Sequence, residues 1–92
     1  MTIKGTTAIV GIGEVPTRRT HPGRSTMGLS AEAIKLALDD AHLRKEDING
    51  LVTDLYPAGP AEYLGIKPRY ATGVDMAGAT GATCVLVAAN AI

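Results

Sequence analysis

The chain has 92 residues, of which 46% are hydrophobic and 20% charged, with nine Lys and Arg, nine Asp and Glu, and one cysteine. This length excludes a two-domain enzyme, since a chain of this size buries only about 60 to 65% of its unfolded surface. The zero net charge excludes a general attraction to nucleic acid or to an anionic membrane surface. A single cysteine and no zinc-ligand spacing exclude a disulfide framework and a metal site, and indicate a reducing, cytoplasmic setting.

Targeting and membrane signals are missing from the sequence pattern. The apolar run near the N-terminus is short and is broken by Gly11 and Gly13, which is not the pattern of a signal-peptide core. The longest unbroken apolar stretch, residues 84–89, is far below the roughly 20 residues that a membrane span needs. The sequence therefore predicts a soluble protein without a membrane span.

The first third of the chain predicts a strand, a loop and a helix. Residues 7–13 are rich in β-branched side chains without polar alternation, which is typical of a strand buried on both faces of a parallel sheet. Residues 17–28 are polar and basic, and predict an exposed loop. Ser30 is a plausible N-cap for the helix that follows, because apolar side chains recur at helical spacing after it. These side chains are Ile34, Ala37, Leu38 and Ala41.

Further elements alternate along the rest of the chain. After a charged connector at residues 44–47, Asn49 and Gly50 predict a turn that leads into a strand at residues 51–54. Residues 61–65 predict a short helix that ends at Gly65, and residues 69–76 predict another strand. This alternation of strands and helices indicates an α/β layered fold without an internal domain boundary.

The final helix, residues 82–92, is the most informative segment. Only Thr83 and Asn90 are polar in it, and a helix that is apolar on nearly every side belongs in the interior of a larger protein. The rest of the chain supplies about three strands and one good amphipathic helix, too few elements to cover it. We therefore expect residues 1–92 to be the N-terminal part of a longer fold, or to fold only against a partner.

Two segments have the composition of phosphate sites. Gly11 and Gly13 follow the first predicted strand as in a dinucleotide fingerprint, but Pro16 takes the place of the third glycine and no helix begins there. Close packing at a strand end is the alternative role for these glycines. The basic loop offers cations for the phosphates of a ligand such as coenzyme A, or is simply a solvated loop. Its cationic and titratable residues are Arg18, Arg19, His21 and Arg24.

The remaining reactive side chains have structural roles as the simpler interpretation. Cys84 falls inside the last helix among aliphatic residues rather than at a helix N-terminus, so we expect a buried structural cysteine. Packing is expected for the tyrosines, and capping or surface roles for the carboxylates at strand ends. His42 is expected in the last turn of the first long helix, where a positive charge is favourable. The tyrosines are Tyr56, Tyr63 and Tyr70, and the carboxylates are Asp54 and Asp75.

Several motifs together carry a family resemblance. The junction VDMAGATGATC at residues 74–84 resembles the thiolase superfamily, and more narrowly its sterol-carrier-protein-x and lipid-transfer-protein branch. The same pattern is met by residues 8–16, the Gly23-Arg24-Ser25 loop, residues 39–43 and residues 47–52. The resemblance extends over essentially the whole chain. It implies the N-terminal part of a thiolase-like layered fold, with a mixed sheet, a buried central helix and a chain that is incomplete as given.

The resemblance also implies a type of chemistry. Working thiolases carry their nucleophilic cysteine where the buried helix begins, and this sequence has Gly78 at that position. Cys84 comes about a turn and a half later, so the nucleophile's role is not transferred to it. Glycine at this place resembles steroid side-chain aldolases, which cleave a β-hydroxyacyl-CoA thioester and act with a partner that carries an OB-fold and a zinc ribbon.

Four functions therefore remain open. We expect retro-aldol carbon-carbon cleavage of an acyl-CoA by a homodimer of the full-length chain, with coenzyme A as part of the substrate and no bound cofactor. No catalytic residue is assigned within the 92 residues, the acid/base groups being expected beyond Ile92, and Arg18, Arg19 and Arg24 are candidate substrate-binding residues. The alternatives are acetyl-CoA acetyltransferase (thiolase) activity of the full-length protein, a catalytically inactive scaffold or lipid-transfer subunit, and a free-standing nucleotide-binding domain.

Overall fold

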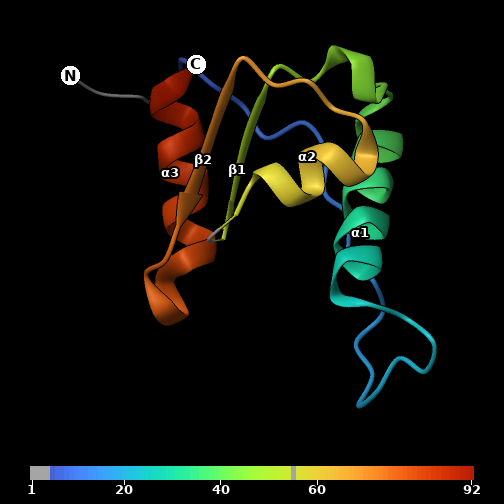
Figure 1. Cartoon of the computed structure of the whole chain (residues 1–92). Coiled ribbons are helices and arrows are strands. Elements are labelled where there is room, and N and C mark those ends of the chain that lie inside the picture. The colour runs from blue at the N-terminus through green and yellow to red at the C-terminus, as the bar shows by residue number, and fades with distance from the viewer. Residues whose placement is uncertain (1–4, 55) are drawn as a thin grey trace.

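The part of the chain that the structure describes is a small mixed α/β domain with three α-helices and a two-stranded parallel sheet (Figure 1). The computed structural model describes residues 5–54 and 56–92. The helices are α1 (Thr26–Ala41), α2 (Ala58–Leu64) and α3 (Thr80–Ala91), and the strands are β1 (Gly50–Asp54) and β2 (Tyr70–Val74). Two 3-10 turns, Lys45–Asp47 and Ala77–Ala79, lie before β1 and α3.

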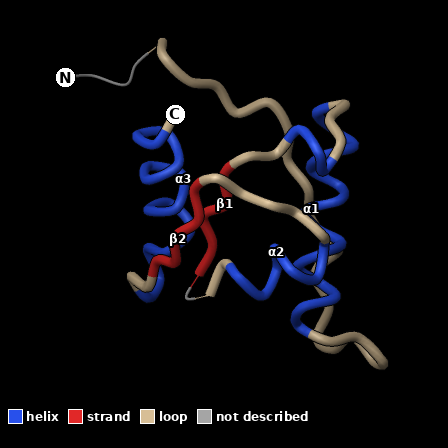
Figure 2. Tube along the Cα trace, turned by 45° about the horizontal axis from the view of Figure 1, so that its top comes forward, coloured by secondary structure: helices blue, strands red, loops and turns tan. Residues whose placement is uncertain are grey.

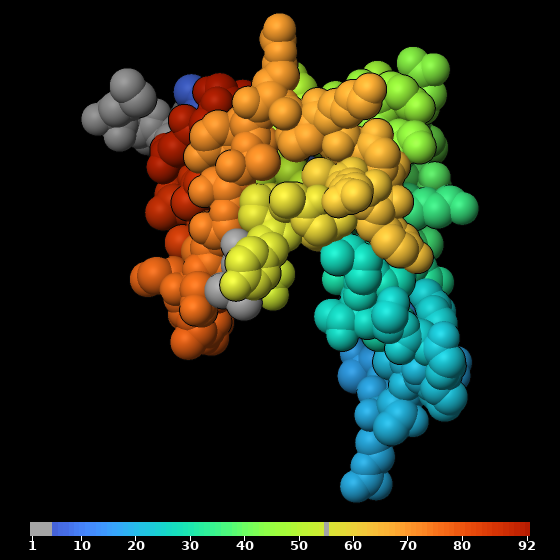
Figure 3. All heavy atoms as spheres, viewed as in Figure 1, coloured from blue at the N-terminus to red at the C-terminus, as the bar shows by residue number. Residues whose placement is uncertain are grey.

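The sheet is a β-α-β unit in which α2 connects the two strands. Gly50 pairs with Tyr70 and Asp54 with Val74, so both strands end at the same edge. Helix α3 packs along both strands, whereas α1 packs on α2 at the other side of the molecule (Figure 2). The result is an elongated arch, 46 × 30 × 22 Å, with the start of α3 and the basic loop at its two feet (Figure 3).

The predicted strand at residues 7–13 is wrong. This segment is extended but joins no sheet, and it crosses from the side of α3 to α1, where it lies against the helix (Figure 2). A Cβ on Gly13 would overlap the backbone of α1 at Ala33 and Ala37, so the absence of a side chain permits this approach. The backbone N–H of Ile12 donates to the Asp40 carboxylate at 2.9 Å instead of to a neighbouring strand.

Helix α1 begins five residues before the predicted start. Its N-cap is Ser25, whose Oγ accepts a hydrogen bond from the Gly28 N–H at 2.9 Å, and not Ser30. The helix ends at His42, which has a left-handed backbone (φ 58°), and the Leu43 N–H returns to the Leu38 carbonyl at 2.9 Å. His42 therefore lies just beyond the last turn and not in it.

The other predicted elements are confirmed with small shifts of their bounds. The strands after the Asn49-Gly50 turn and around Thr72 form β1 and β2, and the final helix forms α3. Helix α2 starts three residues earlier than predicted and ends as expected at Gly65, which has a φ of 73°.

The described residues bury little apolar surface. Only Ala61 and Ile66 are buried hydrophobic residues there, and both belong to α2 and the turn after it. Helix α3 is not covered on all sides by the described residues, because only one side of it contacts the sheet, and Val85 and Leu86 are about half exposed. An open apolar hollow of about 360 Å³ lies where α1, β1 and α3 face one another. Within the described residues, no helix has both the length and the apolar character that crossing a membrane requires.

Candidate functional site

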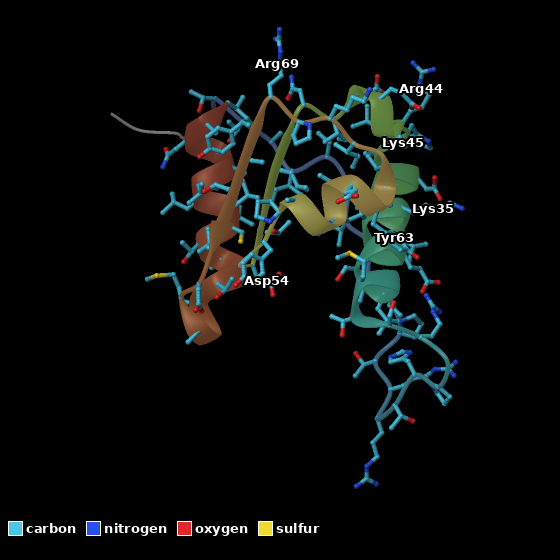
Figure 4. All side chains as sticks on the ribbon, viewed as in Figure 1. Lys35, Arg44, Lys45, Asp54, Tyr63 and Arg69 are labelled. Atoms are coloured by element: carbon cyan, nitrogen blue, oxygen red, sulfur yellow. The ribbon has the colours of Figure 1, made fainter. Side chains whose placement is uncertain are left out.

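The residue types with potential chemistry gather at the edge where both parallel strands end. Asp54 closes β1, Asp75 follows β2, and the turn with Gly78 comes next before α3. In α/β folds, ligands bind outside the carboxyl ends of parallel strands. Figure 4 shows the labelled Asp54 at this lower edge of the sheet, near the start of α3. This edge is therefore the first candidate for a ligand-binding site.

The turn before α3 is held by the hydroxyl of Thr80. This hydroxyl accepts a hydrogen bond from the Met76 N–H at 2.9 Å and donates to the Ala77 carbonyl at 2.8 Å. The Asp75 carboxylate accepts from the Ala77 N–H at 3.4 Å, which is the capping role predicted for it. Main-chain and short side-chain contacts thus fix the backbone on both sides of Gly78.

Gly78 itself is open to the solvent. A Cβ built on it meets no atom within 4 Å, and its N–H has no hydrogen-bond partner among the described residues. From the resemblance, Gly78 is expected where the last helix begins, and it lies in the 3-10 turn that runs directly into α3. The position combines room for a ligand atom with a free main-chain donor near the positive end of the helix dipole.

Cys84 is not part of this edge. It lies inside α3, as predicted, but it is half-buried rather than buried, and it lines the hollow between α1, β1 and α3. Its neighbours there are aliphatic side chains such as Ile34, Leu51 and Ala88. The described structure therefore gives the thiol an apolar setting away from Gly78.

The tyrosines are spread over the surface rather than packed in a core. Tyr56, 77% exposed, comes just after β1, and its N–H donates to the Asp54 carbonyl at 2.6 Å. Tyr70 stands at the opposite end of the sheet, at the start of β2, and Tyr63 lies on α2. Only Tyr56 is thus close in sequence and space to the edge that carries Asp54.

The basic loop forms a separate and partly neutralised site. Arg18, His21 and Arg24 line a hollow of about 390 Å³ together with Glu32, whereas Arg19 does not line it. Arg24 forms an ion pair with Glu32 at 2.7 Å, so its charge is already compensated. This loop and the turn with Gly78 lie at the two separate lower ends of the arch (Figure 3). The described structure therefore does not bring them together into one binding site.

The dinucleotide interpretation of Gly11 and Gly13 has no support in the geometry. The described residues before these glycines form no strand, and the next helix, α1, begins only at Thr26. A Cβ on Gly11 would come within 2.8 Å of Ala41 Cβ, so both glycines serve close packing, the alternative role considered for them.

A groove between α1 and α2 was not predicted from the sequence. It is open to solvent and has a volume of about 800 Å³, with Ile34, Leu38 and Ile66 in its lining. Lys35, Arg44, Lys45 and Tyr63 line it as well and gather on one side of the molecule (Figure 4). The sequence signal for this groove was Lys35 beside two apolar positions of α1. The other lining residues come from segments about ten to thirty residues further along the chain.

The described residues contain no group of three or more His, Cys, Asp or Glu side chains that could hold a metal ion. No protein-family model matches the chain, and no curated protein matches it.

Proposed function

We propose that this chain is part of a thiolase-fold protein that cleaves a carbon-carbon bond of an acyl-CoA thioester by a retro-aldol reaction, without a cysteine nucleophile. The observation that supports the proposal is Gly78. It stands in the turn before α3, where the family that the sequence resembles has its nucleophile, and the only cysteine lies one and a half turns further inside the helix.

The reaction needs no covalent bond to the protein. A base removes the proton of the β-hydroxyl group, the bond between Cα and Cβ breaks, and its electron pair forms the enolate of the shorter acyl-CoA. Protonation of Cα completes this product, and the β-carbon leaves as a ketone or aldehyde. The group that most needs stabilisation is the thioester oxygen, which carries the enolate charge.

This chain offers two features that suit such a step. The space over Gly78 admits a thioester, and the free N–H of Gly78 at the start of α3 is a donor for the enolate oxygen. The proposal assigns no acid or base to these 92 residues. It includes a homodimer of the full-length protein in the cytoplasm, with an OB-fold and zinc-ribbon partner, and coenzyme A as part of the substrate.

The test uses the protein as its own gene expresses it, together with its natural partner subunits. A β-hydroxyacyl-CoA with a tertiary β-carbon is supplied, and the ketone and the shorter acyl-CoA are measured by mass spectrometry. We expect both products in equal amounts, and no loss of activity after alkylation with iodoacetamide. Gly78→Leu, which fills the space over the turn, is expected to lower the rate about a hundredfold, the size of a lost oxyanion contact.

Gly81→Leu is the matched control, because a Cβ at Gly81 also meets no atom within 4 Å and Gly81 lies in the first turn of α3. It should keep the activity within about twofold, the change expected of a surface substitution. Thiolysis of a β-ketoacyl-CoA that iodoacetamide blocks would contradict the proposal and favour the acetyltransferase alternative. No turnover of either substrate would favour an inactive scaffold or lipid-transfer subunit.

A further inference from the structure

We infer that the groove between α1 and α2 is a binding site for a small amphipathic anion, with a hydrocarbon tail and one negatively charged head group. The site is separate from the turn with Gly78, since α1 and α2 lie on the side of the molecule opposite α3 (Figures 1 and 2). It is therefore independent of the proposed catalytic function.

The floor of the groove suits a hydrocarbon tail. Ile34 and Leu38 lie one turn apart on α1, and Leu64 and Ile66 face the same space from the end of α2. The volume of the open groove, about 800 Å³, is within the range of small-molecule sites, which are mostly apolar with a few polar groups. A tail of about ten carbon atoms would cover aliphatic side chains that are now open to water.

Unpaired cations stand at the rim of this floor. The ammonium groups of Lys35 and Lys45 form no hydrogen bond or ion pair with any described residue, and the guanidinium of Arg44 has only a 4.0 Å contact with the Asp47 carboxylate there. The Nζ atom of Lys45 lies 3.4 Å from the position of a Cβ on Gly65, which places it over the C-terminal end of α2. These cations are available for an anionic ligand.

The charges around the groove favour an anion over a cation. Four cations line it against two carboxylates, although the chain as a whole is neutral. One carboxylate, Glu32, is already paired with Arg24 at 2.7 Å, which leaves Asp39 as the other. The excess positive charge is thus a local property of this groove.

Tyr63 completes the polar side of the site. Its side chain is 62% exposed beside the groove, and its hydroxyl has no partner among the described residues, so it can donate to a head group. It is also the only aromatic residue of the lining, which gives no pair of faces between which a nucleobase would stack. A carboxylate-headed acyl chain fits this combination better than a nucleotide.

The test titrates the full chain with decanoate below its micelle concentration and follows the backbone amides by NMR. We expect saturable shifts of signals from α1, α2 and the turn at Lys45, and weaker binding in high salt. Decyltrimethylammonium, which has the same tail and the opposite charge, should bind about fivefold more weakly, since an exposed charge contact contributes up to about that factor.

A pair of double variants separates the site from general charge attraction. Replacing Lys35 and Lys45 with Gln should weaken decanoate binding about tenfold. The control replaces Lys67 and Arg69 with Gln, which removes the same charge from exposed residues outside the groove lining and should leave the affinity unchanged. Arg69 points away from the groove in Figure 4.

Three results would overturn the inference. The first is equal binding of the cationic amphiphile, and the second is an equal loss of affinity in both double variants. The third is a set of shifts centred on the exposed side of α3, at Leu86, because this would show general adsorption to apolar surface. Shifts confined to α1 and α2 with a loss in the groove variant alone would support it.

Discussion

Glycines in this chain serve two opposite purposes. Gly11 and Gly13 let an extended segment approach the backbone of α1, and a side chain at either position would overlap helix atoms. Gly78 and Gly81 instead stand where added atoms meet nothing within 4 Å. The first pair concerns packing, whereas Gly78 leaves space at the edge where a substrate is proposed to bind.

Gly13→Ala should therefore destabilise the chain, and Gly78→Ala should not. A Cβ at Gly13 would overlap the Ala33 carbonyl and come within 2.9 Å of Leu36 Cβ, so the segment has to move away from α1. We expect a loss of about 1 to 3 kcal/mol in the free energy of unfolding, as for overpacking elsewhere. Urea denaturation measures both variants, and amide exchange at Ile12 reports whether its bond to Asp40 opens. Equal stability of the two variants would show that this contact does not form in solution.

At the scale of the element, the start of α1 decides where the basic loop ends. Both Ser25 and Ser30 have the side chain of an N-cap, and the sequence pattern favoured Ser30 because the clear apolar periodicity begins after it. In the structure the helix continues backwards through Gly28 to Thr26, and Ser25 caps it. The loop that carries the arginines is consequently shorter and tied to the helix.

Ser25→Ala should lower the free energy of unfolding by about 1 kcal/mol, because it removes the acceptor of the Gly28 N–H. Ser30→Ala is the matched control. Ser30 is inside the helix, where alanine has the better propensity, so this variant should be neutral or stabilised by a few tenths of a kcal/mol. Thermal or urea unfolding followed by circular dichroism distinguishes the two. The reverse order of stabilities would restore Ser30 as the cap.

Elements whose type follows from local signals were predictable from the sequence. Residues 51–54 follow an Asn-Gly turn, the short helix ends at a glycine, and α3 is too long and too apolar for a loop. The strand predicted at residues 7–13 failed for a non-local reason. A strand exists only beside a partner, and this segment contacts a helix through its glycines.

The candidate site was predictable only in part, for the same reason. The position of Gly78 relative to the last helix follows from one contiguous motif, and the residue lies in the 3-10 turn directly before α3. The groove depends on the packing of α2 against α1, which brings Lys35, Lys45 and Tyr63 together from three separate segments. Arg18, Arg19 and Arg24 are close in sequence, yet only two of them share a hollow and one is paired with Glu32.

At the scale of the whole molecule, the chain exposes much more surface than its mass suggests. A folded monomer of 9.5 kDa exposes about 5,000 Å². This chain exposes 7037 Å², and the surplus includes the outer side of α3, the extended segment near Ile12 and the hollow between α1 and α3. Contiguous exposed apolar patches are typical of regions that contact other protein, and the exposed apolar side chains here include Ile9, Ile12 and Leu86.

The additional exposed surface of the folded chain has a measurable consequence for unfolding by urea. An unfolded chain of this mass has an accessible surface of about 13,800 Å². Unfolding of the described arrangement therefore adds about 6,700 Å² of exposed surface, whereas unfolding of a compact protein of this mass would add about 8,700 Å². Because the dependence of the unfolding free energy on urea concentration scales with this area, we expect about three quarters of the slope of a compact protein of equal length. Such a protein, measured in the same buffer, is the control. A slope at the compact value would contradict the open arrangement. Repeating the titration over a range of protein concentrations then identifies the cause, because self-association raises the midpoint with concentration, whereas closure of the hollow within one chain does not.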